Sequence, residues 1–229
     1  MAVRLISYTK PADFFTQDVE SVQDLVAYCA RVSNPSNQNN KETNEKLIKY
    51  LIKHQHWSPL EMVNACLEIN TTRDIAHQIV RHRSFAFQEF SQRYANPEEM
   101  GDMFVHREAR LQDKKNRQNS VELDENNQED TRLAMIWASH QNKVIREAQE
   151  AYEWAIKNGI AKEQARVVLP EGLTKTRLYM NGTLRSWVHY IELRGGHGTQ
   201  KEHMEIAWAC AKVISEIFPM VDELAELSS

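Results

Sequence analysis

The chain has 229 residues, of which 41% are hydrophobic and 26% charged, and its formal net charge at pH 7 is -4. This length and composition predict a globular protein with one sizeable core, so we expect a single domain over residues 1–229. The acidic balance argues against a nucleic-acid coat, and no apolar run approaches the roughly 20 residues of a membrane span. The first ten residues also lack the long apolar segment of a secretory signal. We therefore expect a cytoplasmic protein that binds neither nucleic acid nor membranes.

The cysteine and histidine patterns argue against metal and thiol chemistry. Three cysteines without a CxxC pair, Cys29, Cys66 and Cys210, do not fit a disulfide scaffold or a structural zinc site. Each lies in an apolar stretch, so we interpret all three as small buried hydrophobic residues rather than nucleophiles. His54 and His56 are two residues apart and no HExxH is present, so we predict no metal site.

The first third of the chain alternates predicted strands and amphipathic helices. Residues 3–8 predict a strand, and the apolar spacing within 19–32 and 42–54 predicts two helices. Pro59 ends the second helix, and the alternating apolar residues of 62–69 predict another strand. Helical spacing resumes over 74–80.

The rest of the chain is predicted to be mainly helical. Residues 95–128 have mixed charges and few apolar residues, so we expect a polar, mobile insertion with one short strand at 103–106. A long helix is predicted over 129–158, closed by Gly159. Further helices are predicted from about residue 161, over 182–194 and over 199–217.

The most informative stretch is DIAHQIVRHRSFAFQEFSQRY, residues 74–94. Each of its arginines can present two N–H donors side by side to a phosphate or a carboxylate, and its aromatic residues suit contact with a flat ring of a ligand. Glu89, Ser91 and Arg93 alternate, so an extended backbone would point all three to one side. A simpler alternative is that Arg81 and Arg83 only close a helix, where cations favour the negative end of its dipole.

Two further stretches carry candidate binding residues. ARVVLP places Arg166 just before an apolar run, where it is either a ligand contact or an ordinary ion-pair partner. In the helix predicted over 182–194, Arg185 and His189 share one face because they are four residues apart. The Gly195–Gly196 pair after it permits a tight turn or a close backbone approach to a ligand.

The arrangement Arg81-His82-Arg83, seven residues, then Ser91 resembles the signature of flavin-dependent thymidylate synthases. The resemblance covers most of the chain through SPLE at 58–61, the stretch 78–94, and ARVVLP through ELR at 165–194. It implies an α+β fold in which an antiparallel sheet is wrapped by long helices. It also implies a single catalytic domain and a homotetramer in which several subunits build each active site.

The chemistry that the resemblance implies is thymidylate synthesis, the conversion of dUMP to dTMP. 5,10-Methylenetetrahydrofolate would give the carbon, and FAD reduced by NADPH would give the hydride. Arg194 would be the catalytic residue, because a cation beside N3 and O4 of the pyrimidine favours the deprotonated ring. No cysteine nucleophile is then required.

The resemblance also implies a set of binding residues. Those implied for dUMP are Gln78, Arg81, Glu89, Phe90, Ser91, Gln92, Arg93, Arg166 and Arg194. Those implied for FAD are Ser58, Arg81, His82, Arg83, Ser84, Glu89, Thr183, Arg185 and His189, with His56 near the open face of the flavin ring.

Some positions depart from the family pattern, and two other functions stay open. Thr183 and His189 stand where asparagines are common, Met62 replaces a frequent histidine, and residues 195–199 include extra residues. One alternative is a phosphate- or RNA-binding module whose arginines and aromatic residues hold single strands. The other is a flavin NADPH oxidoreductase of different specificity.

Overall fold

The computed structural model describes residues 2–13, 15 and 19–221. Its main sheet has four antiparallel strands in the order β1-β2-β6-β3, which confirms the predicted α+β class. The strands of this sheet are β1 (Val3–Tyr8), β2 (Asn64–Thr72), β6 (Lys175–Thr183) and β3 (Ala86–Glu89). The helices are α1 (Val22–Ala30), α2 (Asn44–Lys53), α3 (Arg73–Ile79), α4 (Gln128–Lys157), α5 (Lys162–Ala165), α6 (Leu184–Gly195) and α7 (Lys201–Ser215).

The long central strand β6 was missed by the sequence analysis, which began a helix at Gly182. It pairs with β2 along nine residues, from Asn64↔Thr183 to Thr72↔Lys175. Its inward positions carry Leu178 and Met180, both fully buried, and each such burial stabilises the fold by about 1.5–3 kcal/mol. The signal was weak because only two of its inward-facing residues are large and apolar.

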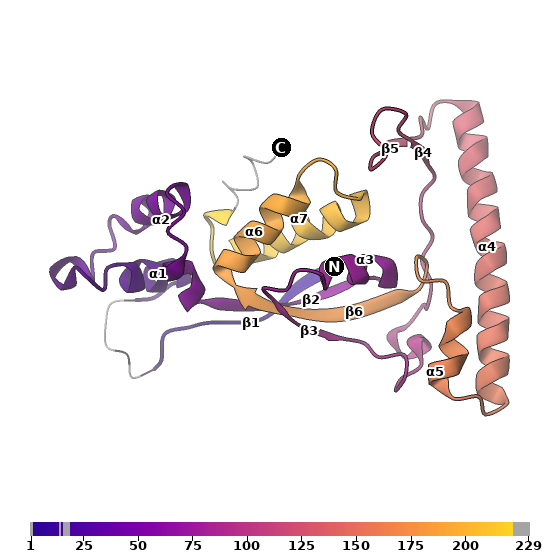
Figure 1. Cartoon of the computed structure of the whole chain (residues 1–229), viewed down its shortest axis with the longest axis horizontal. Coiled ribbons are helices and arrows are strands. Elements are labelled where there is room, and N and C mark those ends of the chain that lie inside the picture. The colour runs from indigo at the N-terminus through magenta and orange to yellow at the C-terminus, as the bar shows by residue number, and fades with distance from the viewer. Residues whose placement is uncertain (1, 14, 16–18, 222–229) are drawn as a thin grey trace.

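Helices α6 and α7 lie over one face of the sheet, and α3 lies beside them (Figure 1). Trp187 and Tyr190 of α6 are buried in the core there. Gly182, at the end of β6, lets the Phe85 ring approach, because a Cβ at this position would lie 2.4 Å from Phe85 Cδ1. The turn after α3 is therefore packed directly against the strand that leads into α6.

Two of the elements predicted in the first third are shorter or shifted in the structure. Helix α1 spans only Val22–Ala30, because Ser21 and Asp24 form a capping box that fixes its start. The strand predicted over 62–69 begins later, at Asn64, since Ser58–Met62 forms a 3₁₀ helix opened by its proline. The strand at 3–8 is confirmed, and the helix predicted over 42–54 is confirmed to within two residues.

The polar segment 95–128 has more regular structure than predicted. It contains a 3₁₀ helix, Pro97–Met100, and a hairpin of β4 (Arg110–Gln112) and β5 (Ser120–Glu122). The strand expected at 103–106 is reduced to one bridge between Phe104 and Thr174. Within the described ranges, no helix is long and apolar enough to cross a membrane.

Helix α4 stands at the opposite end of the molecule from α1 and α2 (Figure 1). It begins where Asn127 accepts hydrogen bonds from two backbone N–H groups, and it ends before Gly159, whose φ is 75°. Tyr152 is buried against the short helix α5 and the loop at Met103. Much of its predicted apolar stripe stays exposed, including Leu133, Ile136, Trp137 and Val144.

Candidate active site

The arginines at 81 and 83 lie beyond the end of α3, so they do not close that helix. Helix α3 ends at Ile79, and the N–H of His82 donates to the Ile79 carbonyl at 3.0 Å. Arg81 and Arg83 are exposed, and neither forms an ion pair with any residue that the structure describes. Both guanidinium groups are therefore available for an anionic ligand.

Between them, His82 points toward the end of α6 and holds Arg194. Arg194 Nε donates to His82 Nε2 at 2.9 Å. Burial, followed by the charges of Arg194 and Arg81, lowers the pKa of His82 to about 4, so the imidazole is a neutral acceptor at pH 7. Arg194 has no carboxylate partner among the described residues, so its charge is not neutralised.

A second contact group beside Arg194 was missed by the sequence analysis. His203, fully buried in the first turn of α7, lies 3.1 Å from Tyr190 Oη and 3.4 Å from Gln78 Oε1. Gln78 Nε2 donates to Gln200 Oε1 at 2.8 Å. The sequence did hold a signal, because His203 shares the apolar stripe of Ile206 and Cys210 in α7.

The expectation that Glu89, Ser91 and Arg93 alternate along an extended backbone was wrong. Strand β3 ends at Glu89, and the Ser91 carbonyl accepts from the N–H groups of Tyr94 and Ala95, which folds residues 91–95 into a turn. The turn forms because the edge strand β3 has paired with β6 only as far as Glu89.

Glu89 itself is held on the sheet. Its Oε1 accepts from Thr176 Oγ1 at 2.9 Å and from Arg73 Nη1 at 3.3 Å. One carboxylate oxygen is thus fixed, and the other has no hydrogen-bond partner in the part of the chain that the structure describes. Phe90, the next residue, is fixed by its N–H to the Arg177 carbonyl.

The turn at 91–95 has several unused donors. The N–H groups of Gln92 and Arg93 form no hydrogen bond with the described residues. Gln92 is buried, and its Nε2 has no partner either, which is unusual for a buried amide. Arg93 lies 3.3 Å from Glu163, and both side chains are about half exposed, so this pair is weak. Such a turn fits an anion.

Four of the predicted flavin residues gather around the start of α6. Thr183 caps the helix, its Oγ1 accepting from the Ser186 N–H at 3.2 Å, and Arg185 pairs with Glu61 at 2.5 Å. The His189 ring packs on Trp57, with ring centroids 4.5 Å apart. Ser58 opens the neighbouring 3₁₀ helix and is exposed.

Two further predicted flavin residues lie on either side of this group. The Ser84 carbonyl accepts from Ser186 Oγ at 3.3 Å, which links the turn after α3 to α6. His56 precedes Trp57 and Ser58 in the chain. It is exposed, and its ring centroid lies 6.0 Å from that of Tyr50. The two stretches that carry the flavin residues are therefore adjacent in the fold.

Two of the residues implied for dUMP, Arg166 and Arg194, are not brought together within the described part of the chain. Arg166 opens a 3₁₀ helix, Arg166–Val168, that follows α5 and packs beside α4. It has no ion-pair or hydrogen-bond partner for its side chain among the described residues. No contact in the described part of the chain joins it to Arg194.

The cysteines show no catalytic environment. Burial raises the pKa of all three thiols, most strongly that of Cys210, which is fully buried. Cys29 and Cys66 are half-buried rather than buried as predicted. Across residues 2–13, 15 and 19–221, no group of three or more histidine, cysteine, aspartate or glutamate side chains is placed to hold a metal ion.

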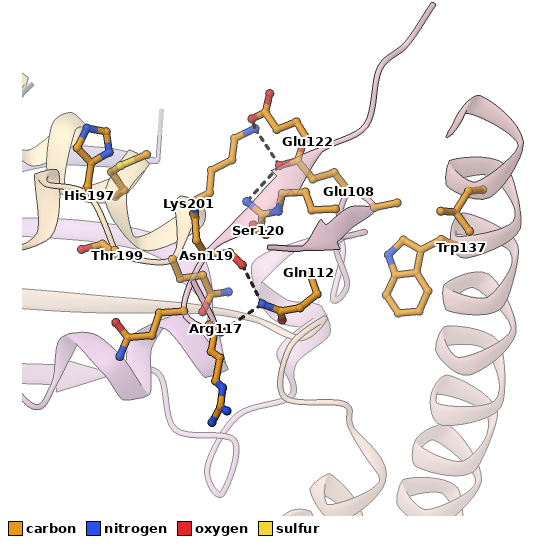
Figure 2. A pocket seen from close by; sticks show the side chains of 17 residues that line it. Glu108, Gln112, Arg117, Asn119, Ser120, Glu122, Trp137, His197, Thr199 and Lys201 are labelled. Carbon is orange, nitrogen blue, oxygen red and sulfur yellow. Dashed lines mark hydrogen bonds and ion pairs between the residues drawn. The ribbon is translucent and has the colours of Figure 1, made fainter. Parts of the chain in front are cut away.

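A cavity of about 710 Å³ adjoins the site between the β4–β5 hairpin, α4 and the start of α7. Figure 2 shows Lys201 reaching toward Glu122 and Glu108, with Trp137 of α4 on the opposite side. Gln200, the partner of Gln78, also lines this cavity. Gln200 therefore connects this cavity to the side chains that lie beside Arg194.

Comparison with known proteins identifies the class. The family model described as "Thymidylate synthase complementing protein" matches residues 15–220. The chain is 48% identical to the "Probable flavin-dependent thymidylate synthase" of Paramecium bursaria Chlorella virus 1, over 96% of this chain and 97% of that protein. It is also 48% identical to the "Flavin-dependent thymidylate synthase" of Synechocystis, with the same coverage.

A solved structure is similar in fold. It is that of PolB, a UMP/dUMP methylase from Streptomyces cacaoi, bound with 5-Br dUMP. The TM-score is 0.77 at 24% identity, covering 97% of this chain and 93% of that one.

The family model and the two relatives define an enzyme class, the thymidylate synthases that depend on flavin. The chain belongs to the flavin-dependent thymidylate synthase family, as the motif at 81–91 predicted.

Proposed function

We propose that this chain converts dUMP to dTMP, with 5,10-methylenetetrahydrofolate as carbon donor and FAD, reduced by NADPH, as hydride donor. Family membership supports the reaction class, and the geometry around Arg194 is consistent with the residues that we propose perform it. The observation that carries the proposal is Arg194, a cation held in place by a neutral histidine instead of a carboxylate.

The role proposed for Arg194 is to make the uracil ring reactive. A positive charge beside N3 and O4 lowers the pKa of the N3–H group and makes C5 electron-rich. A carboxylate partner would cancel much of this effect, whereas neutral His82 orients the guanidinium without cancelling its charge. Burial raises the pKa of all three thiols, so the proposed mechanism uses no covalent attachment through sulfur.

The turn at 91–95 is proposed to hold the nucleotide phosphate. Its support is the set of unused donors there: two backbone N–H groups, the buried amide of Gln92 and the weakly paired Arg93. Ser91 would add a hydroxyl, and Glu89 has one carboxylate oxygen left to accept from the ribose or the ring. Arg81 would approach the phosphate from the turn after α3.

The residues around Arg83 and the start of α6 are proposed to hold FAD. They fit its chemistry, because Arg81 and Arg83 are unpaired cations for a pyrophosphate, and His82 and Ser84 lie in the same turn. Bound and reduced, FAD would supply the hydride. The role of the chain would be to bind the pyrophosphate through its arginines and to contact the flavin through His189 and His56.

A homotetramer with shared active sites is proposed for the assembly. Two observations support it. Met135 and Trp154 on α4 are 70% and 61% exposed, which is unusual for large apolar residues on one helix. Arg166 lies in the 3₁₀ helix that packs beside α4, whereas Arg194 lies in the last turn of α6, which packs on α7, so we expect a site that uses both to need a second subunit.

The decisive experiment is a dTMP-forming assay with each component omitted in turn. We expect product only when dUMP, methylenetetrahydrofolate, FAD and NADPH are all present, and a yellow protein after reconstitution with FAD. A colourless protein that binds no flavin would contradict the proposal. Consumption of NADPH without any dependence on dUMP would favour an oxidoreductase of other specificity.

A further inference from the structure

A hydrogen-bonded series of side chains beside Arg194 runs from Glu202 through Gln200, Gln78 and His203 to Tyr190. It begins at Glu202 in the first turn of α7, whose Oε2 accepts from Gln200 Nε2 at 2.9 Å. Gln200 Oε1 accepts from Gln78 Nε2, Gln78 Oε1 lies 3.4 Å from His203 Nδ1, and His203 Nε2 lies 3.1 Å from Tyr190 Oη. All five residues come from α3, α6 and α7 or the residue just before α7.

The direction of every hydrogen bond in this series follows from its Glu202 end. Burial raises the pKa of Glu202, but hydrogen bonding to Arg110 and the charge of Arg107 outweigh it, and the pKa falls to about 2. The carboxylate is therefore ionised and can only accept. Gln200 must then donate to it through its amide nitrogen, which leaves its oxygen facing Gln78.

The same reasoning assigns the proton positions of His203 and Tyr190 at the other end of the series. Gln78 donates its amide N–H to Gln200, so its oxygen faces His203, and His203 must carry its proton on Nδ1. Burial lowers the pKa of His203 to about 3, so the ring is neutral and Nε2 is bare. Burial also raises the pKa of Tyr190, whose hydroxyl stays protonated and donates to that nitrogen.

We propose that this series fixes the amide of Gln78 with its second N–H free for the nucleotide, which makes His203 a positioning residue for substrate binding. The inference rests on the proposed function and on the contact of Gln78 with dUMP that the family resemblance implies. The free N–H has no partner among the described residues, and it selects an acceptor oxygen on the ligand. A flipped amide would present an oxygen instead and would repel that same atom.

The test compares two substitutions of His203 in the full enzyme, with dissociation constants measured for dUMP and FAD. His203→Leu removes both ring nitrogens, so we expect dUMP affinity to fall about tenfold and FAD affinity to stay within about twofold. His203→Asn keeps a donor near the position of Nδ1, so we expect it to retain dUMP affinity within about threefold. A residue that only supports packing would not distinguish the two ligands.

A double-mutant cycle tests whether His203 acts through Gln78. In a Gln78→Ala background, His203→Leu should change dUMP affinity by less than about twofold, because the group that it orients is gone. An equal loss in both backgrounds, or no loss in the single variant, would overturn the inference. If His203→Leu does not fold, Gln200→Ala at the exposed end of the series replaces it, with an expected loss of about threefold that also disappears in the Gln78→Ala background.

The wild-type protein separates this inference from the proposed function. If wild type binds dUMP but His203→Leu binds it equally well, only the positioning role is wrong. If wild type binds flavin but no dUMP, the proposed function is wrong, and the positioning role is wrong with it.

Discussion

The two ends of the site differ in how completely one chain builds them. Beside α6 and α7, buried polar groups are joined to each other, and Arg194 is held by His82. Beside α4, the side chain of Arg166 has no partner among the described residues, and large apolar side chains remain exposed, among them Trp154. This difference supports the proposal that one chain positions the groups that act on the pyrimidine, while the groups near α4 work with a neighbouring subunit.

Removing Arg194 should have the largest effect. Arg194→Ala deletes the charge that stabilises the deprotonated ring, so we expect kcat to fall by about 10²–10³-fold. Arg194→Lys should recover part of the loss, because lysine keeps the charge but lacks the Nε–H group that donates to His82. The measurement is dTMP formation, with flavin absorbance as the control for folding. A kcat within about fivefold of wild type would contradict the role given to Arg194.

The division of the site between subunits can be tested by mixing two inactive variants. If each site takes Arg166 from one subunit and Arg194 from another, coexpressed Arg166→Ala and Arg194→Ala chains will form hybrid sites with both arginines. We expect about a quarter of wild-type activity from such a random mixture. Activity no higher than that of either variant alone would place both residues in one subunit.

The buried histidine predicts a moderate effect of pH on stability. His203 has a folded pKa near 3 against an ordinary value near 6.5, so its contribution is fully present above pH 6.5 and is lost as pH falls. By pH 5 the loss is roughly 2 kcal/mol. The free energy of unfolding in urea, measured at pH 7 and pH 5, should fall less in His203→Leu than in wild type. An equal decrease in the free energy of unfolding in the two proteins would mean that the pKa of His203 is not lowered in the folded protein.

The smallest effect is expected from removing the thiols. A variant with Cys29→Ala, Cys66→Ala and Cys210→Ala should keep its kcat within about twofold, because no base among the described residues lowers the pKa of any of the three thiols. It should lose about 1 kcal/mol or more of stability, mainly from the small cavity left at the fully buried Cys210. Loss of dTMP formation in a folded variant would favour a cysteine nucleophile.

Much of the site was predictable from local sequence, because Arg81–Arg83, Glu89 and Arg194 lie in contiguous motifs. The strand β6 was not, since its inward face includes Thr176 and Gly182, and its outward face is mainly charged or polar, with Tyr179 as the one aromatic residue of the strand. The turn at 91–95 was not predictable either. The alternation of Glu89, Ser91 and Arg93 predicts an extended backbone, and alternation alone does not reveal where an edge strand stops pairing. The contact of His203 with Gln78 joins residues 125 apart, and no periodicity predicts such a pairing.

The most direct measurement is release of tritium from C5 of labelled dUMP by the cysteine-free protein reconstituted with FAD. With methylenetetrahydrofolate and NADPH present, we expect release at a rate close to that of wild type, and almost none after Arg194→Ala is added. Release that requires a cysteine, or that continues unchanged without Arg194, would contradict activation of the ring by an unneutralised arginine.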